Sequence, residues 1–502
     1  MASNPTGKSV IIIGAGIAGL SAGVYAQMNG YKSRIYELHN LPGGLMTAWK
    51  RKGYVIDGCI HWLSGSSPVY EDYYKMWQDI GLIQGREMFD PEVFTRVEGP
   101  NGEILQLYTD VNKLEKHLLK LAPEDRAVIL NFCKAVRVFT GFMMPSDISG
   151  FGGVLRVLPK LPGALRAMPL FMKWAKLTMK DFAGQFKNPF LRQSFHDLWF
   201  PEMTAIGLLF TLAMLHNKSA GYPMGGSLPM AHAVEKRYCD LGGEIYYSTR
   251  VSRILVENGK AVGVQLTDGR EERADLVISA ADGHATIFDM LGGQFVDEKI
   301  QAMYREGKIF PPLVFSGLGV KRTFKDLYGI TGGISFFIND PIEIAGKPIE
   351  RLEMMIYNFD PSLAPEGKTV LTCMVGSEYA YWKELSAEPE RYEAEKERVA
   401  LEVINRLDRR FPGLAEQVEM ADVATPLTFE RYTGNWQGSF EGWLPTPQAV
   451  MSQPRYTLPG LENFYMIGQW VQPGGGLPSG IMTGKAVVKM MCKKDRTRFR
   501  TS

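Results

Sequence analysis

The chain of 502 residues is too long for one ordinary hydrophobic core, so we expect two or more domains, some of them built from discontinuous segments. Hydrophobic residues make up 45% and charged residues 22% of the chain, and the formal net charge of only +2 argues against a nucleic-acid-binding protein. The cysteines and histidines show no CxxC pair and no metal-ligand spacing, which argues against a metal site and indicates reduced thiols in the cytoplasm.

No stretch of the sequence is apolar enough to span a membrane. The longest nearly apolar run, residues 203–215, is shorter than the roughly 20 residues that a spanning helix needs. The polar residues 1–9 lead directly to the first predicted strand, without the apolar core of a secretory signal. We therefore expect a cytoplasmic protein, with peripheral contact to a membrane as the alternative to be weighed below.

The first predicted elements form a βαβ unit. Residues 10–13 are a short apolar run, which is typical of a strand buried on both faces. A helix then extends to about residue 29, and a second strand is predicted at residues 33–37. This order predicts a parallel sheet of the Rossmann type.

The turn between the first strand and the helix has the spacing GxGxxG. Gly14 permits the tight turn, Gly16 lets the backbone approach a pyrophosphate, and Gly19 lets the helix pack closely on the strand. The helix N-terminus directs its amides and positive dipole end at the phosphates. Glu37 ends the second strand where a carboxylate binds ribose hydroxyls, and it disfavours NADP because it repels a 2′-phosphate. A lone GxGxxG also occurs in ordinary glycine turns, but its context here favours a dinucleotide site.

The remaining elements follow in three groups. Residues 72–216 read as long helical stretches without the alternation of a strand. After residues 221–226 a second α/β pattern is predicted, with a helix at 228–241 and strands at 244–247, 261–266 and 274–280. A separate α+β region follows, with strands at 313–320, 353–358 and 369–375 and a charged helix at 391–410. The chain then returns to a strand at 464–467, a loop rich in Gly and Pro, and a helix at about 479–492.

The residues after Glu37 resemble the extended FAD fingerprint of one protein superfamily. Leu41-Pro42-Gly43-Gly44 adds a second glycine pair, followed by Thr47 and by Gly53-Tyr54-Val55-Ile56-Asp57. The arrangement is similar to that of flavin amine oxidases, phytoene desaturases, carotenoid isomerases, retinol saturases and the Rab GDP-dissociation inhibitors. The resemblance implies FAD, not NAD, as the dinucleotide.

Three further segments resemble the branch of phytoene desaturases, carotenoid isomerases and retinol saturases. The first is Tyr222-Pro223-Met224-Gly225-Gly226-Ser227 with the helix that follows it and Arg250-Val251, and the second runs from Thr425-Pro426 to Gly438. The third, residues 467–480, looks like the C-terminal "G-x-x-x-x-P-G-x-G-x-P" signature of that branch. The resemblance covers both ends and the middle of the chain, and it is poor in the helical segment and at residues 313–414.

The resemblance implies an α/β fold with a discontinuous Rossmann-type FAD-binding domain and an α+β substrate domain that carries a helical insert. The implied domains are residues 1–75, 221–292 and 455–495 for FAD, 76–220 for the insert, and 293–454 for the α+β domain. The residues expected to bind the cofactor are Gly14, Ala15, Gly16, Ala18, Gly19, Glu37, Leu38, Gly43, Gly44, Leu45, Met46, Val251, Gly468, Gln469, Gly476, Leu477, Pro478 and Ile481.

The C-terminal signature also has a mechanical interpretation. Its glycines let backbone amides approach the flavin, and a helix that begins near Ser479 directs its positive end at the flavin N1/C2=O region. The alternative is an ordinary loop at the start of a helix. Three residues depart from the family pattern: Leu45 where much of the superfamily has Arg, Cys59 in place of Gly, and Gln469 where many relatives have an acid.

His61 is the candidate catalytic residue. Ile60-His61-Trp62 is similar to the "G-I-H" pattern of retinol saturases, and the resemblance implies that this stretch lies beside the isoalloxazine ring. An imidazole titrates near neutral pH, so we consider proton transfer, with a hydrogen bond to backbone or flavin as the alternative. Cys59 is interpreted as a small buried thiol in preference to a covalent attachment site for the flavin.

Residues 149–180 combine basic, apolar and proline residues with Trp174 and contain no acid. Such a segment fits short helices that lie in a membrane interface, or a cap over the substrate cavity whose lysines face water. Both alternatives imply an apolar ligand, and the first adds peripheral membrane contact.

We therefore predict hydride transfer between the flavin and the C–C or C=C bonds of a lipophilic substrate, with a polyisoprenoid such as a carotenoid or retinoid as the first choice. Desaturation, saturation and isomerisation stay open. No second GxGxxG unit follows in the chain, so oxygen, a quinone or an electron-transfer protein is expected as the electron partner in place of bound NAD(P)H.

Two other classes share the implied scaffold. A flavin amine oxidase normally ends in a "G-E" or "G-D" pair, which Gly468-Gln469 and the proline-rich loop fit poorly. A prenyl-binding chaperone of the GDP-dissociation-inhibitor type uses no flavin and usually has a degraded phosphate loop, whereas both glycine motifs are intact here.

Overall fold

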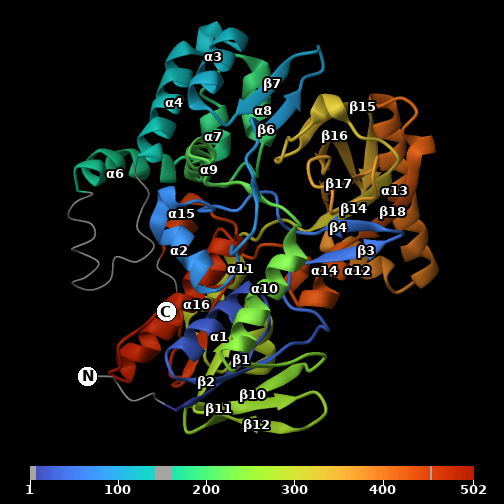
Figure 1. Ribbon diagram of the computed structural model, residues 1–502. Helices are drawn as coiled ribbons and strands as arrows, with labels where there is room; N and C mark the ends of the chain where they lie inside the picture. Colours follow the sequence, from blue (N-terminus) through green and yellow to red (C-terminus); the bar gives the residue numbers. More distant parts are fainter. Residues whose placement is uncertain (1–6, 142–160, 453–454, 502) are drawn as a thin grey trace.

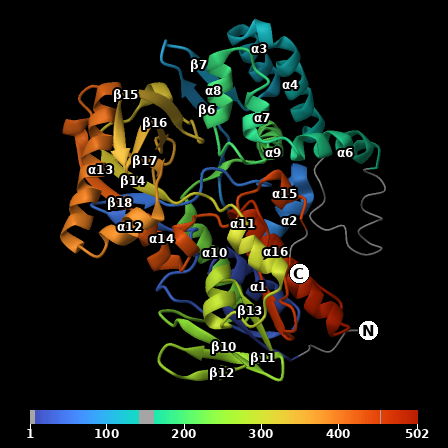
Figure 2. The same ribbon diagram turned by 180° about the vertical axis from the view of Figure 1, so that it is seen from behind.

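The computed structural model describes residues 7–141, 161–452 and 455–501, and these form three packed regions (Figures 1 and 2). A parallel sheet with its helices lies at one end of the molecule. A seven-stranded sheet and a group of helices lie at the other end. The first and last parts of the chain, drawn in blue and red, lie side by side in the parallel-sheet region.

The parallel sheet is assembled from three distant parts of the sequence. Its strand order is β19-β13-β1-β2-β9, and every neighbouring pair is parallel. The strands are β1 (Ser9–Ile13), β2 (Lys32–Tyr36), β9 (Glu244–Tyr246), β13 (Leu276–Ser279) and β19 (Phe464–Met466). The predicted Rossmann-type α/β fold class is therefore confirmed.

Both faces of this sheet are covered, which explains the continuous apolar run in β1. Val10 and Ile12 pack in the core that includes α1 (Ile17–Met28), α10 (Ser227–Asp240) and α16 (Gly476–Lys494). Ile11 and Ile13 point to the opposite side, toward a small antiparallel sheet. That sheet consists of β10 (Val251–Glu257), β11 (Lys260–Leu266) and β12 (Glu271–Arg273).

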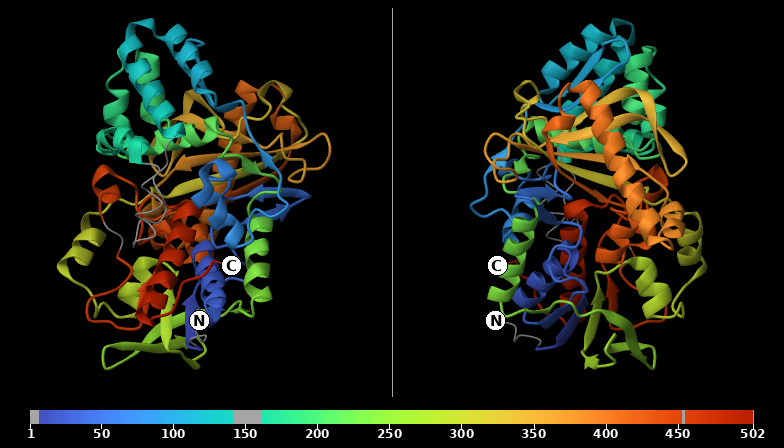
Figure 3. Two further views of the ribbon diagram at one scale, coloured as in Figure 1. Left: turned by 60° about the vertical axis from the view of Figure 1, so that its left-hand side comes forward. Right: turned by 90° about the vertical axis from the view of Figure 1, so that its right-hand side faces the viewer.

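The second region is a sheet of order β18-β14-β17-β16-β15-β6-β7. Its strands from the later part of the chain are β14 (Leu313–Val320), β15 (Ile334–Ile344), β16 (Lys347–Ile356), β17 (Thr369–Gly376) and β18 (Val418–Ala424). The outer face is covered by α13 (Pro389–Arg410) and α12 (Tyr379–Leu385), with Trp382 fully buried between them and the sheet (Figure 3). The inner face looks toward the parallel-sheet region.

The prediction of helices without strands at residues 72–216 is wrong for one part of that range. The structure has β5 (Met88–Phe89), β6 (Val93–Glu98) and β7 (Ile104–Tyr108), and β6 and β7 extend the seven-stranded sheet. The side chains of β7 alternate between buried and half-buried, and Gly102 lies in the turn that joins it to β6. These strands are short and carry polar residues, so the sequence pattern is weak. The domain boundaries as a whole stay a prediction.

The remaining part of that range is helical and has a core rich in aromatic residues. Its helices are α2 (Glu71–Asp79), α3 (Val111–Leu121), α4 (Arg126–Thr140), α6 (Leu161–Ala175), α7 (Met179–Ala183), α8 (Pro189–Asp197) and α9 (Ile206–His216). Phe132, Phe182 and Phe195 meet at ring distances of 5.1 to 5.8 Å, which fixes α4 against α7 and α8.

Residues 149–160 of the predicted membrane-contact segment 149–180 lie outside the described residues. Within α6, Trp174 is buried, while Leu165 is 68% and Met168 is 40% exposed. None of the helices that the structure describes is both long and apolar enough to cross a membrane.

Candidate functional site

A cavity opens at the carboxyl ends of the parallel strands. Gly14 directly follows β1, Glu37 follows β2, Ala280 follows β13, and Gly468 lies two residues after β19. The empty volume, which includes open solvent at the mouth, is about 1210 Å³. Ligands of open α/β sheets bind at this edge.

The two glycine motifs form one continuous wall of the cavity. The N–H of Gly43 donates to the carbonyl of Ala15 at 2.8 Å, and Gly16 and Gly43 form a parallel bridge. A Cβ atom added to Gly44 would lie 3.3 Å from the Cα of Gly16. Gly14 has φ +96°, a conformation that favours glycine. The wall therefore presents backbone without side chains, which suits close approach by a pyrophosphate.

Two helices begin at this cavity without a side-chain cap. The N-cap of α1 is Gly16 and that of α16 is Gly475. Because glycine has no side chain, neither N-cap residue can accept a side-chain hydrogen bond from the first backbone N–H groups of its helix. A Cβ on Gly480 would lie 2.6 Å from Cγ2 of Ile17, so this glycine lets the two helix starts approach each other. Free amides at two helix starts suit a ligand with two electron-rich groups, such as the pyrophosphate and the flavin ring of FAD.

Glu37 is buried at the end of β2, where it lines the cavity. Its carboxylate accepts hydrogen bonds from the backbone N–H of Ala15 at 2.6 Å and of His39 at 2.8 Å. Burial raises the pKa of this carboxyl group, and the two backbone donors oppose that shift. A fixed acid at this position suits a ribose and repels a phosphate.

Most of the residues predicted to bind the cofactor lie together on the cavity wall. They are Gly14, Gly16, Ala18, Glu37, Leu38, Gly43, Gly44, Leu45, Met46, Val251, Gly468, Gln469, Gly476 and Leu477. Ala15, Gly19, Pro478 and Ile481 are not part of the wall. A Cβ on Gly19 would lie 1.9 Å from the carbonyl oxygen of Gly14, and Ile481 is fully buried in the core, so both support the site from behind. The contacts of these residues with FAD stay predictions.

Several wall residues are not in the predicted set, among them Asp282, Asn435, Glu441 and Trp470. Asp282 lies three residues after β13. Because ligands of such sheets bind at the carboxyl ends of the strands, its position just after a predicted strand is a signal that could have identified it. Asn435 and Glu441 follow α14 (Pro426–Thr433). Asn435 lies within the segment from Thr425 to Gly438 that resembles the family, so this resemblance is a signal that could have identified it, whereas Glu441 lies beyond that segment.

Two of these residues are acids whose pKa is shifted toward neutrality. The carboxylate of Asp282 accepts from the N–H of Ala285 at 2.7 Å and of Trp436 at 2.9 Å, and burial raises its pKa to about 7. Burial also raises the pKa of Glu441 to about 7, and this side chain has no hydrogen-bond partner among the described residues. Acids of this kind can hold or release a proton near neutral pH.

His61 lies beyond the cavity wall, two residues after Cys59, which is part of the wall. The loop between them is fixed by Asp57, which accepts from the N–H groups of Cys59 and Ile60 and from Ser227 at the start of α10. Burial lowers the pKa of His61 to about 4, so its imidazole is neutral at pH 7. Its role in proton transfer stays a prediction.

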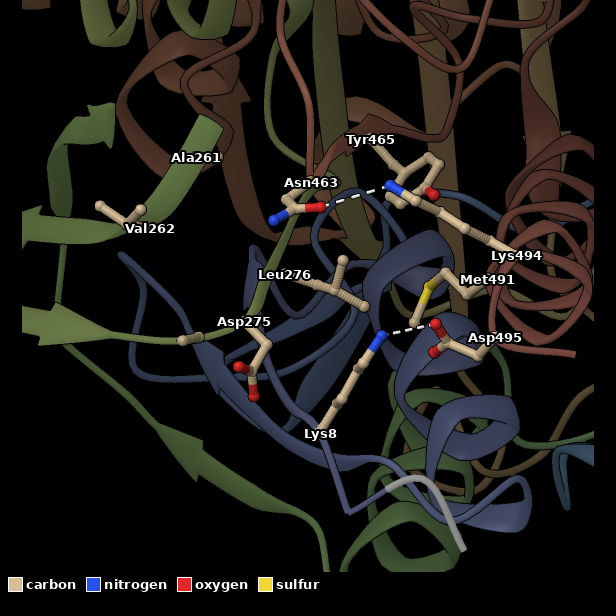
Figure 4. A pocket seen from close by; sticks show the side chains of 11 residues that line it. Lys8, Ala261, Val262, Asp275, Leu276, Asn463, Tyr465, Met491, Lys494 and Asp495 are labelled. Carbon is tan, nitrogen blue, oxygen red and sulfur yellow. Dashed lines mark hydrogen bonds and ion pairs between the residues drawn. The ribbon is translucent and has the colours of Figure 1, made fainter. Parts of the chain in front are cut away.

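A second pocket lies at the opposite edge of the parallel sheet (Figure 4). Lys8, Asp275 and Asn463, which line it, directly precede β1, β13 and β19, and Lys8 pairs with Asp495 at 2.5 Å. This is the amino edge of the strands, away from the helix starts described above. In the part of the chain that the structure describes, no group of three or more His, Cys, Asp or Glu side chains is suited to hold a metal ion.

Comparison with known proteins identifies related sequences over nearly the whole chain. Residues 17–491 match the family model of the flavin containing amine oxidoreductases. The chain is 27% identical to phytoene desaturase (neurosporene-forming) of Rhodobacter capsulatus, with 98% of this chain and 95% of that protein aligned. It is 26% identical to the chloroplastic prolycopene isomerase of Arabidopsis thaliana, with 94% and 81% aligned.

Solved structures support the same fold. An oxidoreductase from Methanosarcina mazei matches 96% of this chain and 100% of its own with a TM-score of 0.64 at 18% identity. A putrescine oxidase with bound putrescine matches 97% and 99% with a TM-score of 0.59 at 13% identity. At these identities the likeness concerns the fold alone.

Proposed function

This chain belongs to the family of flavin containing amine oxidoreductases and is an FAD-dependent oxidoreductase, and we propose that it acts on the C–C or C=C bonds of a lipophilic polyisoprenoid. The observation that carries the proposal is the near full-length similarity to a phytoene desaturase and a prolycopene isomerase. Desaturation, saturation and isomerisation are the three reactions to be distinguished.

The apolar surroundings of the cofactor cavity support a lipophilic substrate. Phe440 lines the cavity, and its ring lies 5.3 Å from that of Phe310. Phe310 in turn lies 5.5 Å from Phe200, which belongs to the segment between α8 and α9. A row of aromatic side chains therefore leads from the cavity toward the helical region, and such a surface excludes water and contacts a polyene chain well.

The residues of the chain have separate tasks in this proposal. Backbone amides at the starts of α1 and α16 would hold the pyrophosphate and the flavin, and Glu37 would hold the adenosine ribose. When bound, FAD accepts or supplies the hydride. Glu441 and Asp282 would hold or release a proton at the cavity wall, since burial raises the pKa of each to about 7. The imidazole of His61 would be a weak proton acceptor, since burial lowers its pKa to about 4.

The proposal is tested on the purified flavoprotein under anaerobic conditions. We expect the flavin absorbance to change when the oxidised or reduced protein is mixed with a panel of polyenes, and to remain unchanged with a panel of amines. Product analysis by mass and retention time then separates the three reactions. Reduction of the flavin by amines with release of hydrogen peroxide would instead establish an amine oxidase.

A further inference from the structure

The inner face of the seven-stranded sheet carries two charged side chains in its central strand β16. Arg351 and Glu353 are two residues apart and therefore share a face, while Leu352 and Met354 point to the opposite face and are buried under α13. Met355, on the same face as Arg351 and Glu353, packs in the core of the parallel-sheet region. The two charges thus face the interior of the molecule.

The accessibility and the surroundings of Glu353 together indicate that these side chains line a hollow inside the molecule. The side chain of Glu353 is accessible to water, and its strand β16 is the central strand of the sheet. Protein nevertheless surrounds the carboxyl group, and this partial loss of solvent raises its pKa to about 7. Asp197 at the end of α8 lies across from it, close enough for its charge to act on both Arg351 and Glu353. A side chain that water reaches inside a ring of protein lines an internal cavity.

Aromatic side chains connect this hollow with the loop of His61. The ring of Trp62 stacks on that of Trp199 at 6.5 Å and meets the edge of Phe94 at 5.1 Å. Trp199 lies two residues after Asp197, and Phe94 belongs to β6, which pairs with β15. The polar pair therefore lies at one end of an aromatic surface that begins near the cofactor cavity.

Arg351 is held in place by neutral groups. Its Nε donates to Oγ of Ser335 at 3.1 Å, one Nη donates to the backbone carbonyl of Glu98 at 3.4 Å, and its guanidinium lies 4.1 Å from the ring centre of Phe337. The carboxylate of Glu98 is already paired with Arg410 at 2.8 Å. Among the described residues no carboxylate forms an ion pair with Arg351, and no group forms a hydrogen bond with the carboxyl of Glu353.

We propose that this hollow binds the polar end of the substrate, and that Arg351 and Glu353 recognise an uncharged hydroxyl group at one end of a lipophilic molecule. The proposal rests on the function proposed above. A hydroxyl accepts a hydrogen bond from a guanidinium and donates one to a carboxylate, so it satisfies both side chains. A pure hydrocarbon would leave both without a partner in an enclosed space.

The charges of the site argue against a carboxylate or an ammonium group at the end of the substrate. One guanidinium faces the carboxyl groups of Glu353 and Asp197, and Asp197 also accepts from His196 at 2.8 Å and Gln193 at 2.6 Å. Since the raised pKa leaves Glu353 largely protonated below pH 7, Arg351 and Asp197 then balance each other, and a carboxylate or an ammonium end group would add a charge that the site does not compensate. A neutral polar group is the one that the site accommodates without an excess of charge.

The test compares ligands that differ only in the end group, using the holoenzyme under anaerobic conditions. Retinol, its hydrocarbon analogue, retinoic acid and retinylamine form one series, and β-carotene and zeaxanthin form a longer pair. Dissociation constants are measured from the quenching of tryptophan fluorescence and from the shift of the flavin spectrum, so the readout does not depend on turnover. We expect the alcohols to bind about 10- to 100-fold more tightly than the hydrocarbons.

Variants assign this preference to the two side chains. We expect Arg351→Met and Glu353→Met to abolish the preference for alcohols without weakening hydrocarbon binding, and Glu353→Gln to retain most of it because an amide still accepts a hydrogen bond. Glu350→Met, on the same strand but the opposite face, and Arg409→Met, which removes an exposed ion pair with Asp340, are matched controls that should keep the preference.

The outcomes separate the two proposals. Equal affinity for alcohol and hydrocarbon in the wild type, or tighter binding of the acid or the amine, would overturn the hydroxyl site and leave the polyisoprenoid function standing. Absence of binding for every polyene in both series would overturn the proposed function itself.

Discussion

Glu441 shows how a single side chain in the cofactor cavity can set the pH dependence of the protein. Burial raises the pKa of its carboxyl from 4.5 to about 7, so the folded chain binds this proton more tightly than the unfolded chain does. Stability contributed by the protonated form is therefore lost as the pH rises through that interval, at up to about 1.4 kcal/mol per pH unit. Asp282 acts in the same direction.

We expect Glu441→Gln to flatten this dependence. The melting temperature of the flavin-free variant should fall less between pH 5 and pH 7 than that of the wild type, because the group that loses its proton in the folded state is gone. Thermal unfolding followed by circular dichroism at several pH values measures the effect. Glu462→Gln, on the surface, serves as the control, and identical slopes for wild type and Glu441→Gln would contradict the assignment.

At the scale of single residues, the sequence predicts the parts of the site that depend on backbone. Gly16 and Gly44 can be identified because a close approach between chain segments requires glycine, and Glu37 because it ends a strand at a fixed distance. Glu441 could not be identified, since it lies outside the segments that resemble the family and only the tertiary fold brings it to the cavity. The same holds for Glu353, whose position on the inner face of the sheet, near Asp197 of α8, depends on elements far away in sequence.

At the scale of secondary structure, the contact between α1 and α16 determines the geometry of the cofactor cavity. Gly480 and Gly484 are one turn apart on α16 and both face α1. A Cβ on Gly484 would lie 2.9 Å from the backbone N and 3.1 Å from a carbonyl oxygen of α1, neither of which can move independently. The two helices can therefore approach each other only while these positions lack side chains.

We expect Gly484→Ala to destabilise the protein by roughly 1–3 kcal/mol, although alanine favours the helical conformation. The helices should separate, and the purified variant should retain less FAD, as measured by the ratio of flavin to protein absorbance. Gly376→Ala is the control, because a Cβ there has no neighbour within 4 Å and the backbone does not require glycine. Full flavin content and unchanged stability in Gly484→Ala would show that the helix contact is not limiting.

The helix α6 is the element that we propose contacts a membrane surface. Leu165 is 68% and Met168 is 40% exposed, and Lys173 and Lys176 are also exposed nearby. The double variant Leu165→Asp and Met168→Asp should bind anionic vesicles at least about tenfold more weakly, since burying such a side chain contributes about 1.5–3 kcal/mol. Leu401→Asp, on α13 at the other side of the molecule, is the control for co-sedimentation. Equal binding by both variants would exclude this role for α6.

Strands with a strong local hydrophobic pattern are predicted correctly from the sequence, and strands with a weak pattern are missed. The strands β1 and β13 are continuous apolar runs buried on both faces, and both are predicted within two residues at each end. The strand β15 is not predicted because Asn339, Asp340 and Pro341 interrupt it, and the ladder with β16 shifts its register at that place. The strands β6 and β7 are missed because β6 pairs with β15 and β7 pairs with β6, and this pairing gives both strands a stability that their own sequence does not indicate.

At the scale of the whole molecule, the cofactor cavity joins segments from the two ends and the middle of the chain. Residues after β1, β13 and β19 form its wall, so FAD bound there would contact parts that are otherwise far apart in sequence. A ligand that binds only the folded form stabilises it by mass action.

We expect added FAD to raise the melting temperature of the flavin-free protein, with a gain of about 2.7 kcal/mol at a concentration of one hundred times Kd. NAD and NADP at the same concentration should produce little change. Glu37 repels the 2′-phosphate of NADP, and the cavity wall continues beyond the adenosine site to the start of α16, where the flavin of FAD is expected to bind. Differential scanning fluorimetry measures the three shifts side by side. A larger shift with NADP than with FAD would contradict the arrangement proposed for Glu37.

The discontinuous parallel sheet also determines when the protein can acquire its cofactor during synthesis. The strand β19 and helix α16 follow the other strands of this sheet in the chain, and at about 5–20 residues per second roughly 10 to 40 seconds separate the synthesis of β13 from that of β19. During that interval the nascent chain has an open edge at β13 and lacks the helix α16 that packs on α1. We therefore expect the cavity to hold flavin only after β19 and α16 have been made, because residues that follow β19 and residues at the start of α16 line it.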